Sequence, residues 1–126
     1  MKVFTDTDAW VAYRNSLNGV SVGFVPTMGA LHAGHMALVD ASRADNAVTL
    51  VSIFVNPTQF DENSDFDAYP VNYQEDLEKL DAAGVDAVFL PTSQQVYTDN
   101  YRFKVSEDEF SRQLCGAHRP GHFMVY

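Results

Sequence analysis

The sequence has few cysteines, few basic residues and no long apolar run. Its only cysteine is Cys115, so no disulfide can form within the chain, as is usual in a reducing cytosol. Eight Lys and Arg stand against 17 Asp and Glu, whereas a nucleic-acid partner requires clustered positive charge. No apolar run approaches the roughly 20 residues of a membrane span, and the N-terminus lacks the apolar core of a signal peptide. These absences predict a cytoplasmic protein without a nucleic-acid or membrane partner.

The residues that are present suit one α/β domain over 1–126. Apolar runs alternate with helical patterns, which favours a Rossmann-like parallel sheet flanked by helices. Pro26 is expected to stop the strand that precedes it. Strands are expected at 2–4, 20–25, 47–55, 85–90 and 101–105. Helices are expected from a cap at Thr5 or Thr7 to 17, at 34–43, from a cap at Asn72 to 83 with Gly84 after it, at 93–97, and from a cap at Ser106 to 114. The stretch 59–71 is predicted to be a loop.

The stretch 24–39, FVPTMGALHAGHMALV, carries the clearest chemical signal. Gly29 and Gly34 are expected to bracket a tight turn between a strand and a helix, and Gly34 would let a ligand approach the backbone. Such a junction presents free backbone N–H groups and the positive end of a helix dipole, which suits a phosphate. His32 and His35 fall on the same side of a first helical turn. There they can donate hydrogen bonds to charge on a phosphoryl group.

Three blocks in this order resemble the pantothenate synthetase (pantoate–β-alanine ligase) family, within the H-x-G-H nucleotidyltransferase superfamily. The blocks are PTMGALHAGH at 26–35, VSIFVNPTQF at 51–60 with Asp65-Phe66 and Tyr69-Pro70 after it, and RPGHF at 119–123. The likeness covers nearly the whole chain. It implies a ligase that condenses pantoate with β-alanine through a pantoyl-adenylate intermediate, with ATP as a substrate and Mg²⁺ bridging the phosphate oxygens.

The resemblance also implies which residues act. His35 would be the proton donor or charge stabiliser and His32 its partner. Gln59 would contact pantoate and β-alanine, with Asn56 shaping the same pocket. The ATP-binding residues would be Met28, Gly29, Ala30, Leu31, His32, Ala33, Gly34 and His35. The family also implies a homodimer, and no protein-bound metal is expected.

The chain departs from the family pattern in two respects. Val71 stands where the family usually has arginine. The family's later lysine-, glutamine- and arginine-containing stretches and its C-terminal domain have no counterpart, so the chain looks like the front half of the enzyme. We therefore expect weak or no synthetase turnover from the 126-residue chain alone.

Other functions remain open at this point. The chain could be a nucleotide-binding module without turnover, or another H-x-G-H nucleotidyltransferase. A four-histidine metal site is a further alternative, because the His32–His35 and His118–His122 spacings are ones that zinc sites use. Arg119 and His122 could approach the active site or stabilise a loop.

Overall fold

The computed structural model describes residues 1–55 and 73–97. Its elements in chain order are β1 (Lys2–Phe4), α1 (Thr7–Asn15), β2 (Val22–Thr27), α2 (Ala33–Asp45), β3 (Val48–Ile53), α4 (Tyr73–Ala82), β4 (Ala87–Phe89) and α5 (Ser93–Val96). The chain divides into two units, Met1–Val55 with Pro70–Pro91, and Asn56–Tyr69 with Thr92–Tyr126. The expectation of one domain over 1–126 stays a prediction.

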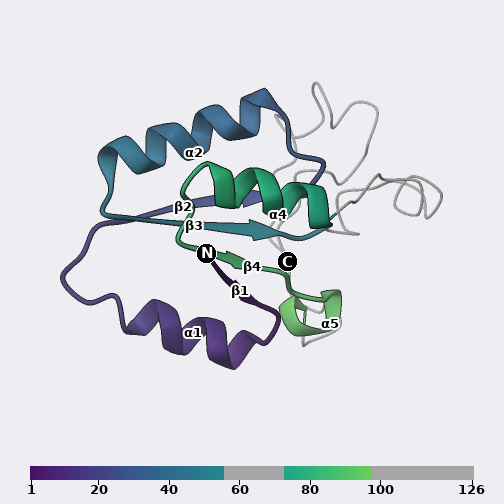
Figure 1. The fold of residues 1–126 in the computed structure, drawn as a ribbon. Helices are drawn as coiled ribbons and strands as arrows, with labels where there is room; N and C mark the ends of the chain where they lie inside the picture. The colour runs from purple at the N-terminus through teal and green to yellow at the C-terminus, as the bar shows by residue number, and fades with distance from the viewer. Residues whose placement is uncertain (56–72, 98–126) are drawn as a thin grey trace, which may run out of the picture. The chain divides into compact units, whose positions relative to one another are not determined.

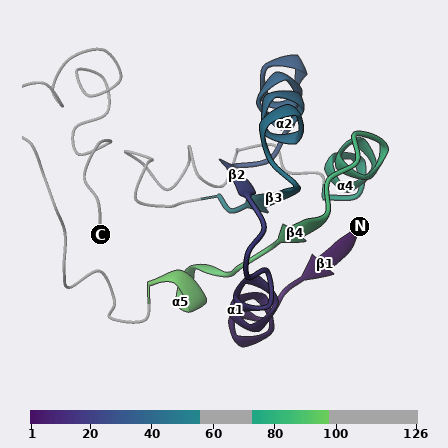
Figure 2. The ribbon, with the colours of Figure 1, turned by 90° about the vertical axis from the view of Figure 1, so that its left-hand side faces the viewer.

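The first unit is built on four parallel strands in the order β1-β4-β3-β2 (Figure 1). Helices α2 and α4 cover one face of this sheet and α1 covers the other (Figure 2). The predicted α/β fold with a parallel sheet and flanking helices is therefore confirmed. Because the strands are parallel, the segments that follow β2 and β3 leave the sheet at the same edge, where open α/β folds place their ligands.

The core lies between the sheet and helices α2 and α4. Leu80 of α4 is fully buried there, against a cluster that comprises Val25, Leu31, Val39, Val51, Ile53, Val85 and Val88. On the other face, Trp10 of α1 stacks on Phe89 of β4 with ring centroids 5.0 Å apart. No helix within 1–55 and 73–97 has the length and apolar character that a membrane crossing requires.

The strand before the turn lies two residues later in the chain than predicted, at 22–27 instead of 20–25. Pro26 does not stop it, since β2 runs through Pro26 to Thr27 and pairs with β3 over its whole length. The physical reason is that β2 is the outer strand of the described sheet. A proline lacks the N–H that a second neighbouring strand would need, but an outer strand leaves that position unpaired.

The helix caps differ in part from the prediction. The cap at Thr5 or Thr7 is wrong, because Asp6 is the N-cap and its carboxylate accepts the Ala9 N–H at 2.9 Å. Gly84 has φ +85° after α4, as expected for a residue that ends a helix. The predicted loop 59–71, strand 101–105, helix 106–114 and Asn72 cap lie outside the described residues.

Candidate functional site

The turn that leaves β2 is tight and left-handed. Gly29 and Ala30 have φ of +83° and +51°, a conformation that glycine adopts freely and alanine rarely does. The Thr27 hydroxyl donates to the Ser52 carbonyl oxygen at 2.9 Å and accepts the Gly29 N–H at 3.2 Å. The turn is therefore tied to β3 at its start.

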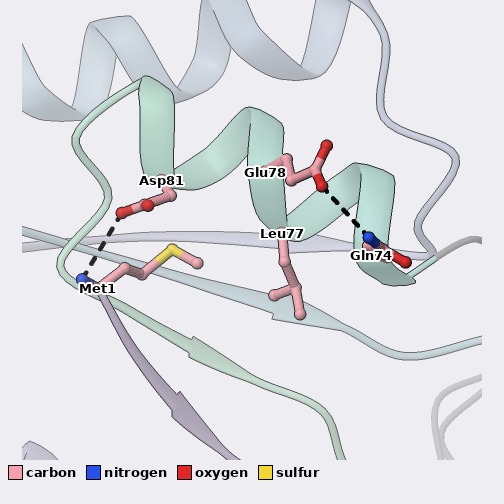
Figure 3. Close-up of a pocket in the computed structure, with 5 residues that line it drawn as sticks. All are labelled: Met1, Gln74, Leu77, Glu78 and Asp81. Carbon is pink, nitrogen blue, oxygen red and sulfur yellow. Dashed lines mark hydrogen bonds and ion pairs between the residues drawn. The ribbon is translucent and has the colours of Figure 1, made fainter.

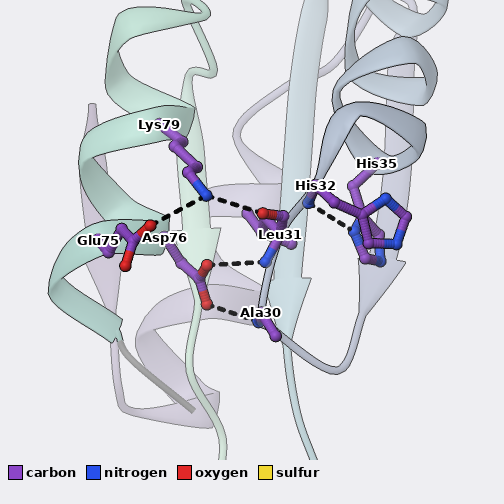
Figure 4. A network of polar contacts seen from close by, with 7 residues as sticks. All are labelled: Ala30, Leu31, His32, His35, Glu75, Asp76 and Lys79. Atoms are coloured by element: carbon purple, nitrogen blue, oxygen red, sulfur yellow. Dashed lines mark hydrogen bonds and ion pairs between the residues drawn. The ribbon is translucent and has the colours of Figure 1, made fainter. Parts of the chain in front are cut away.

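Helix α4 holds the same turn from the other side (Figure 4). The Asp76 carboxylate, 2% exposed, accepts the N–H groups of Ala30 and Leu31, each at 2.9 Å. Lys79 donates to the Leu31 carbonyl oxygen at 2.9 Å, and its ammonium lies 3.2 Å from the Glu75 carboxylate. These side chains connect two segments that are 45 or more residues apart in the sequence.

The two histidines form the N-terminal cap of α2. His32 is the N-cap, and its Nδ1 accepts the Gly34 N–H at 3.0 Å. His35, three residues on, accepts the His32 N–H on its own Nδ1 at 3.2 Å. The arrangement is a capping box in which imidazoles replace the usual hydroxyl and carboxylate. The ring centroids lie 4.1 Å apart, so the predicted pairing of the two side chains is confirmed.

These hydrogen bonds indicate the tautomer of each ring in its neutral form. A neutral imidazole carries one proton, and a nitrogen that accepts a hydrogen bond cannot hold it. The proton of His32 and that of His35 are therefore on Nε2, the ring atom that points away from the helix end. The pair presents two N–H donors, which suits a ligand with negatively charged oxygens.

The surroundings of His35 favour its neutral form. Burial lowers the pKa of His35 below its ordinary 6.5, and the neighbouring His32 lowers it further, while the Asp76 carboxylate acts in the opposite direction. A lowered pKa keeps Nδ1 free of a proton at neutral pH, as the cap requires. Protonation of Nδ1 would remove the acceptor of the His32 N–H.

A pH dependence of stability follows from this shift. Below pH 6.5 the unfolded state binds more protons at His35 than the folded state, so this contribution to stability is complete above pH 6.5. It falls as the pH drops from there through the folded pKa. Melting temperatures between about pH 5 and 8 should show a steeper acid decline for the wild type than for His35→Gln, because glutamine at this position can cap without titrating. Equal slopes would contradict the assignment.

The backbone of the turn is less available to a ligand than the sequence predicted. Residues whose N–H groups already have partners inside the protein are Gly29, Ala30, Leu31, His32 and Gly34. The donors that remain at this junction are the two imidazole Nε2–H groups and the N–H of Ala33. A phosphate there would therefore meet mainly side-chain donors.

The absence of a side chain at Gly34 makes room for the His32 ring as well as for a ligand. A Cβ at position 34 would lie 2.9 Å from Cε1 and 3.1 Å from Nδ1 of the His32 ring. In Gly34→Ala the ring should swing away from the helix end. The lost cap costs about 1 kcal/mol, which offsets the gain of about 1 kcal/mol from alanine in a helix. We expect an unchanged melting temperature with a changed His32 tautomer by ¹⁵N NMR, whereas a stabilised protein with an unchanged tautomer would argue against the contact.

The remaining predicted site residues fall outside the part of the chain that the structure describes. They are Asn56, Gln59, Val71, His118, Arg119 and His122. Within 1–55 and 73–97, no group of three or more His, Cys, Asp or Glu side chains is placed to hold a metal ion.

A separate groove of about 460 Å³ lies between α4 and Met1 (Figure 3). It is near the amino end of β1, whereas the histidines follow the carboxyl end of β2. Its polar groups are paired with each other, since Gln74 donates to Glu78 at 3.4 Å and the Met1 ammonium lies 3.7 Å from Asp81. The groove is therefore a weaker candidate for a ligand-binding site than the turn.

Sequence reasoning missed Asp76 and Lys79, which hold the turn. One signal was present, because Asp76 lies four residues before Leu80 and thus on the buried face of the predicted helix. A carboxylate on a buried helix face needs a partner. The sequence alone did not identify the N–H groups that serve as this partner.

The chain matches the family model described as pantoate-beta-alanine ligase over residues 2–125. It is 48% identical to the pantothenate synthetase of Bdellovibrio bacteriovorus over 122 residues, which are 97% of this chain and 48% of that protein. It is 53% identical to the pantothenate synthetase of Fervidobacterium nodosum over 105 residues, which are 83% of this chain and 38% of that protein.

Solved structures of related proteins also resemble this chain. The crystal structure of pantoate-beta-alanine ligase from Francisella tularensis, complexed with beta-gamma ATP and beta-alanine, matches with a TM-score of 0.93 and 40% identity over 98% of this chain and 48% of that one. Pantothenate synthetase from Thermus thermophilus matches with a TM-score of 0.85 and 39% identity over 98% and 44% of the two chains. The chain thus spans about half the length of these relatives.

Proposed function

Because this chain belongs to the pantoate-beta-alanine ligase family, we propose that it serves the ATP-dependent condensation of pantoate with β-alanine to pantothenate. The observation that carries the proposal is the pair of outward-directed imidazole N–H donors at the start of α2. The family match over 2–125 includes this pair and favours the ligase over a different H-x-G-H nucleotidyltransferase. We expect the protein to act in the cytoplasm and as a homodimer.

The proposed reaction has two steps. The pantoate carboxylate attacks the α-phosphorus of ATP, which forms pantoyl adenylate and releases pyrophosphate. The β-alanine amine then attacks the activated carbonyl, which forms the amide and releases AMP. Adenylation makes the carboxylate reactive because AMP is a far better leaving group than an oxide ion.

The histidine pair would act in the first step. Negative charge builds on the phosphate oxygens as the pantoate oxygen approaches, and preorganised donors that face this charge lower the barrier. His35 and His32 would donate from Nε2. The ATP site would extend over 28–35, with the backbone playing a smaller part where its N–H groups are already paired.

Mg²⁺ would reach the site with ATP. Magnesium commonly keeps several waters and binds phosphate oxygens rather than a cage of side chains. The buried Asp76 carboxylate is already occupied by two N–H groups, so the triphosphate itself would supply the ligands.

Gln59 and Asn56 would form the pocket for pantoate and β-alanine. Both are neutral amides just after β3 in the sequence, and an amide can hold a carboxylate or a hydroxyl without adding charge. The family resemblance around VSIFVNPTQF is what supports this pocket.

Calorimetric titration of ATP and of pantoate tests the assignment. The wild type should bind both ligands, and Gln59→Ala should no longer bind pantoate but should bind ATP as the wild type does. His35→Ala is the complementary variant and should bind ATP more weakly. If Gln59→Ala binds pantoate as well as the wild type, the pocket is assigned to the wrong residue.

A second candidate is nucleotide binding without turnover. It is favoured by the imidazole Nε2–H donors at the start of α2, which can hold a phosphate without a second substrate. ATP binding without release of pyrophosphate in the presence of pantoate would support this candidate. Pantothenate formation by the 126-residue chain at a normal rate would exclude it.

A further inference from the structure

Helix α4 holds the turn through two side chains of opposite charge, Asp76 and Lys79. The carboxylate takes the N–H groups of two successive residues, Ala30 and Leu31, and the ammonium donates to the carbonyl oxygen of Leu31. Both charges thus act on the backbone of a single two-residue segment (Figure 4). A buried carboxylate is unfavourable unless it is hydrogen-bonded, and here both of its oxygens are used on the turn.

The segment that Asp76 and Lys79 hold contains a residue in a strained backbone conformation. Ala30 has φ +51°, which an alanine rarely adopts and which persists only when the surroundings enforce it. The next residue, Leu31, is anchored in the core at 3% exposure. His32 follows at once as the N-cap of α2. The direction of the turn at Ala30 and Leu31 therefore decides where α2 begins and how its cap lies.

We propose that Asp76 is a positioning residue for the histidine pair, since its hold on Ala30 and Leu31 sets the turn that directs both imidazole Nε2–H groups outward. Asp76 itself would not touch the substrate. The expected effect on ATP rests on the function proposed above, but the effect on the imidazoles does not.

Asp76→Asn is the sharpest test because it preserves size and removes one acceptor. The amide nitrogen of asparagine would face a backbone N–H, donor against donor. Glu78→Gln is the matched control, since it makes the same change of charge on the exposed side of the same helix. Two measurements on the 126-residue chain are needed, namely ATP affinity by calorimetry and the tautomers of His32 and His35 by ¹⁵N NMR without ligand.

In Asp76→Asn, both imidazoles should become mixtures of tautomers and the Kd for ATP should rise at least about tenfold. Glu78→Gln should match the wild type in both measurements. If Asp76 acts only through its charge, the asparagine variant will lower the pKa of His35 and leave the tautomers unchanged. That result would overturn the proposal.

The two proposals fail in different ways. If the wild type does not bind ATP, the proposed function is wrong, and the tautomers still decide whether Asp76 positions the rings. If Asp76→Asn does not fold, Asp76→Glu replaces it, because it keeps the charge but displaces the carboxylate from the N–H groups of Ala30 and Leu31. Tautomers in Asp76→Glu that are identical to those of the wild type would then count against the proposal.

Discussion

Replacing Gly29 with alanine should lower the free energy of unfolding by about 3 kcal/mol. The backbone at Gly29 has φ +83°, which strains any other residue. A Cβ there would also lie 3.1 Å from Cγ2 of Ile53 and 3.2 Å from Oδ2 of Asp76, two side chains that are almost fully buried and have little room to move. Urea unfolding would show the loss as a lower midpoint with an unchanged slope.

Gly19→Ala is the control for Gly29→Ala. Gly19 has φ +77°, close to the value at Gly29, but a Cβ there would meet nothing within 4 Å. The control should therefore lose only the cost of the backbone strain, about 1 kcal/mol. Equal losses in the two variants would show that the contacts with Ile53 and Asp76 contribute nothing.

Leu80→Ala should destabilise the protein by about 2–5 kcal/mol. Leu80 is completely buried between α4 and the sheet, so alanine would leave a cavity in the main core. A domain of ordinary stability has about 5–15 kcal/mol in total, so the variant should be close to unfolding at physiological temperature. Thermal denaturation by circular dichroism would measure the loss.

Leu38→Ala is the matched substitution on the surface. The Leu38 side chain lies on α2 and is 57% exposed, so its truncation should change stability by no more than about 0.5 kcal/mol. A loss comparable to that of Leu80→Ala would mean that Leu38 is covered in solution, for example by a second copy of the chain.

The strand–turn–helix junction could be predicted because its signals are local. The apolar run before Pro26, the glycines of the turn and the helical spacing after Gly34 all act within a few residues. The pairing of His32 and His35 depends on helix geometry alone, and the structure confirms it. The predicted ends of the elements were less accurate. Pro26 is an example, because the residues around it do not reveal that β2 is the outer strand of the described sheet.

The occupation of the turn's N–H groups could not be predicted for a different reason. The acceptors on Asp76 lie 45 and 46 residues away in the sequence, and no local pattern specifies which buried carboxylate meets which amide. The histidine caps were missed because imidazole is not among the usual N-cap side chains. The pocket predicted around Gln59 and Asn56 stays a prediction, since both lie outside the described residues.

The imidazole cap also bears on whether this histidine pair could chelate a metal. A zinc ion binds the lone pair of a ring nitrogen. In both rings the Nδ1 lone pair is engaged by the backbone and Nε2 carries the proton. Zn²⁺ could therefore bind only after both rings had changed tautomer and the helix had lost its cap. Micromolar zinc should leave the imidazole resonances of His32 and His35 unchanged.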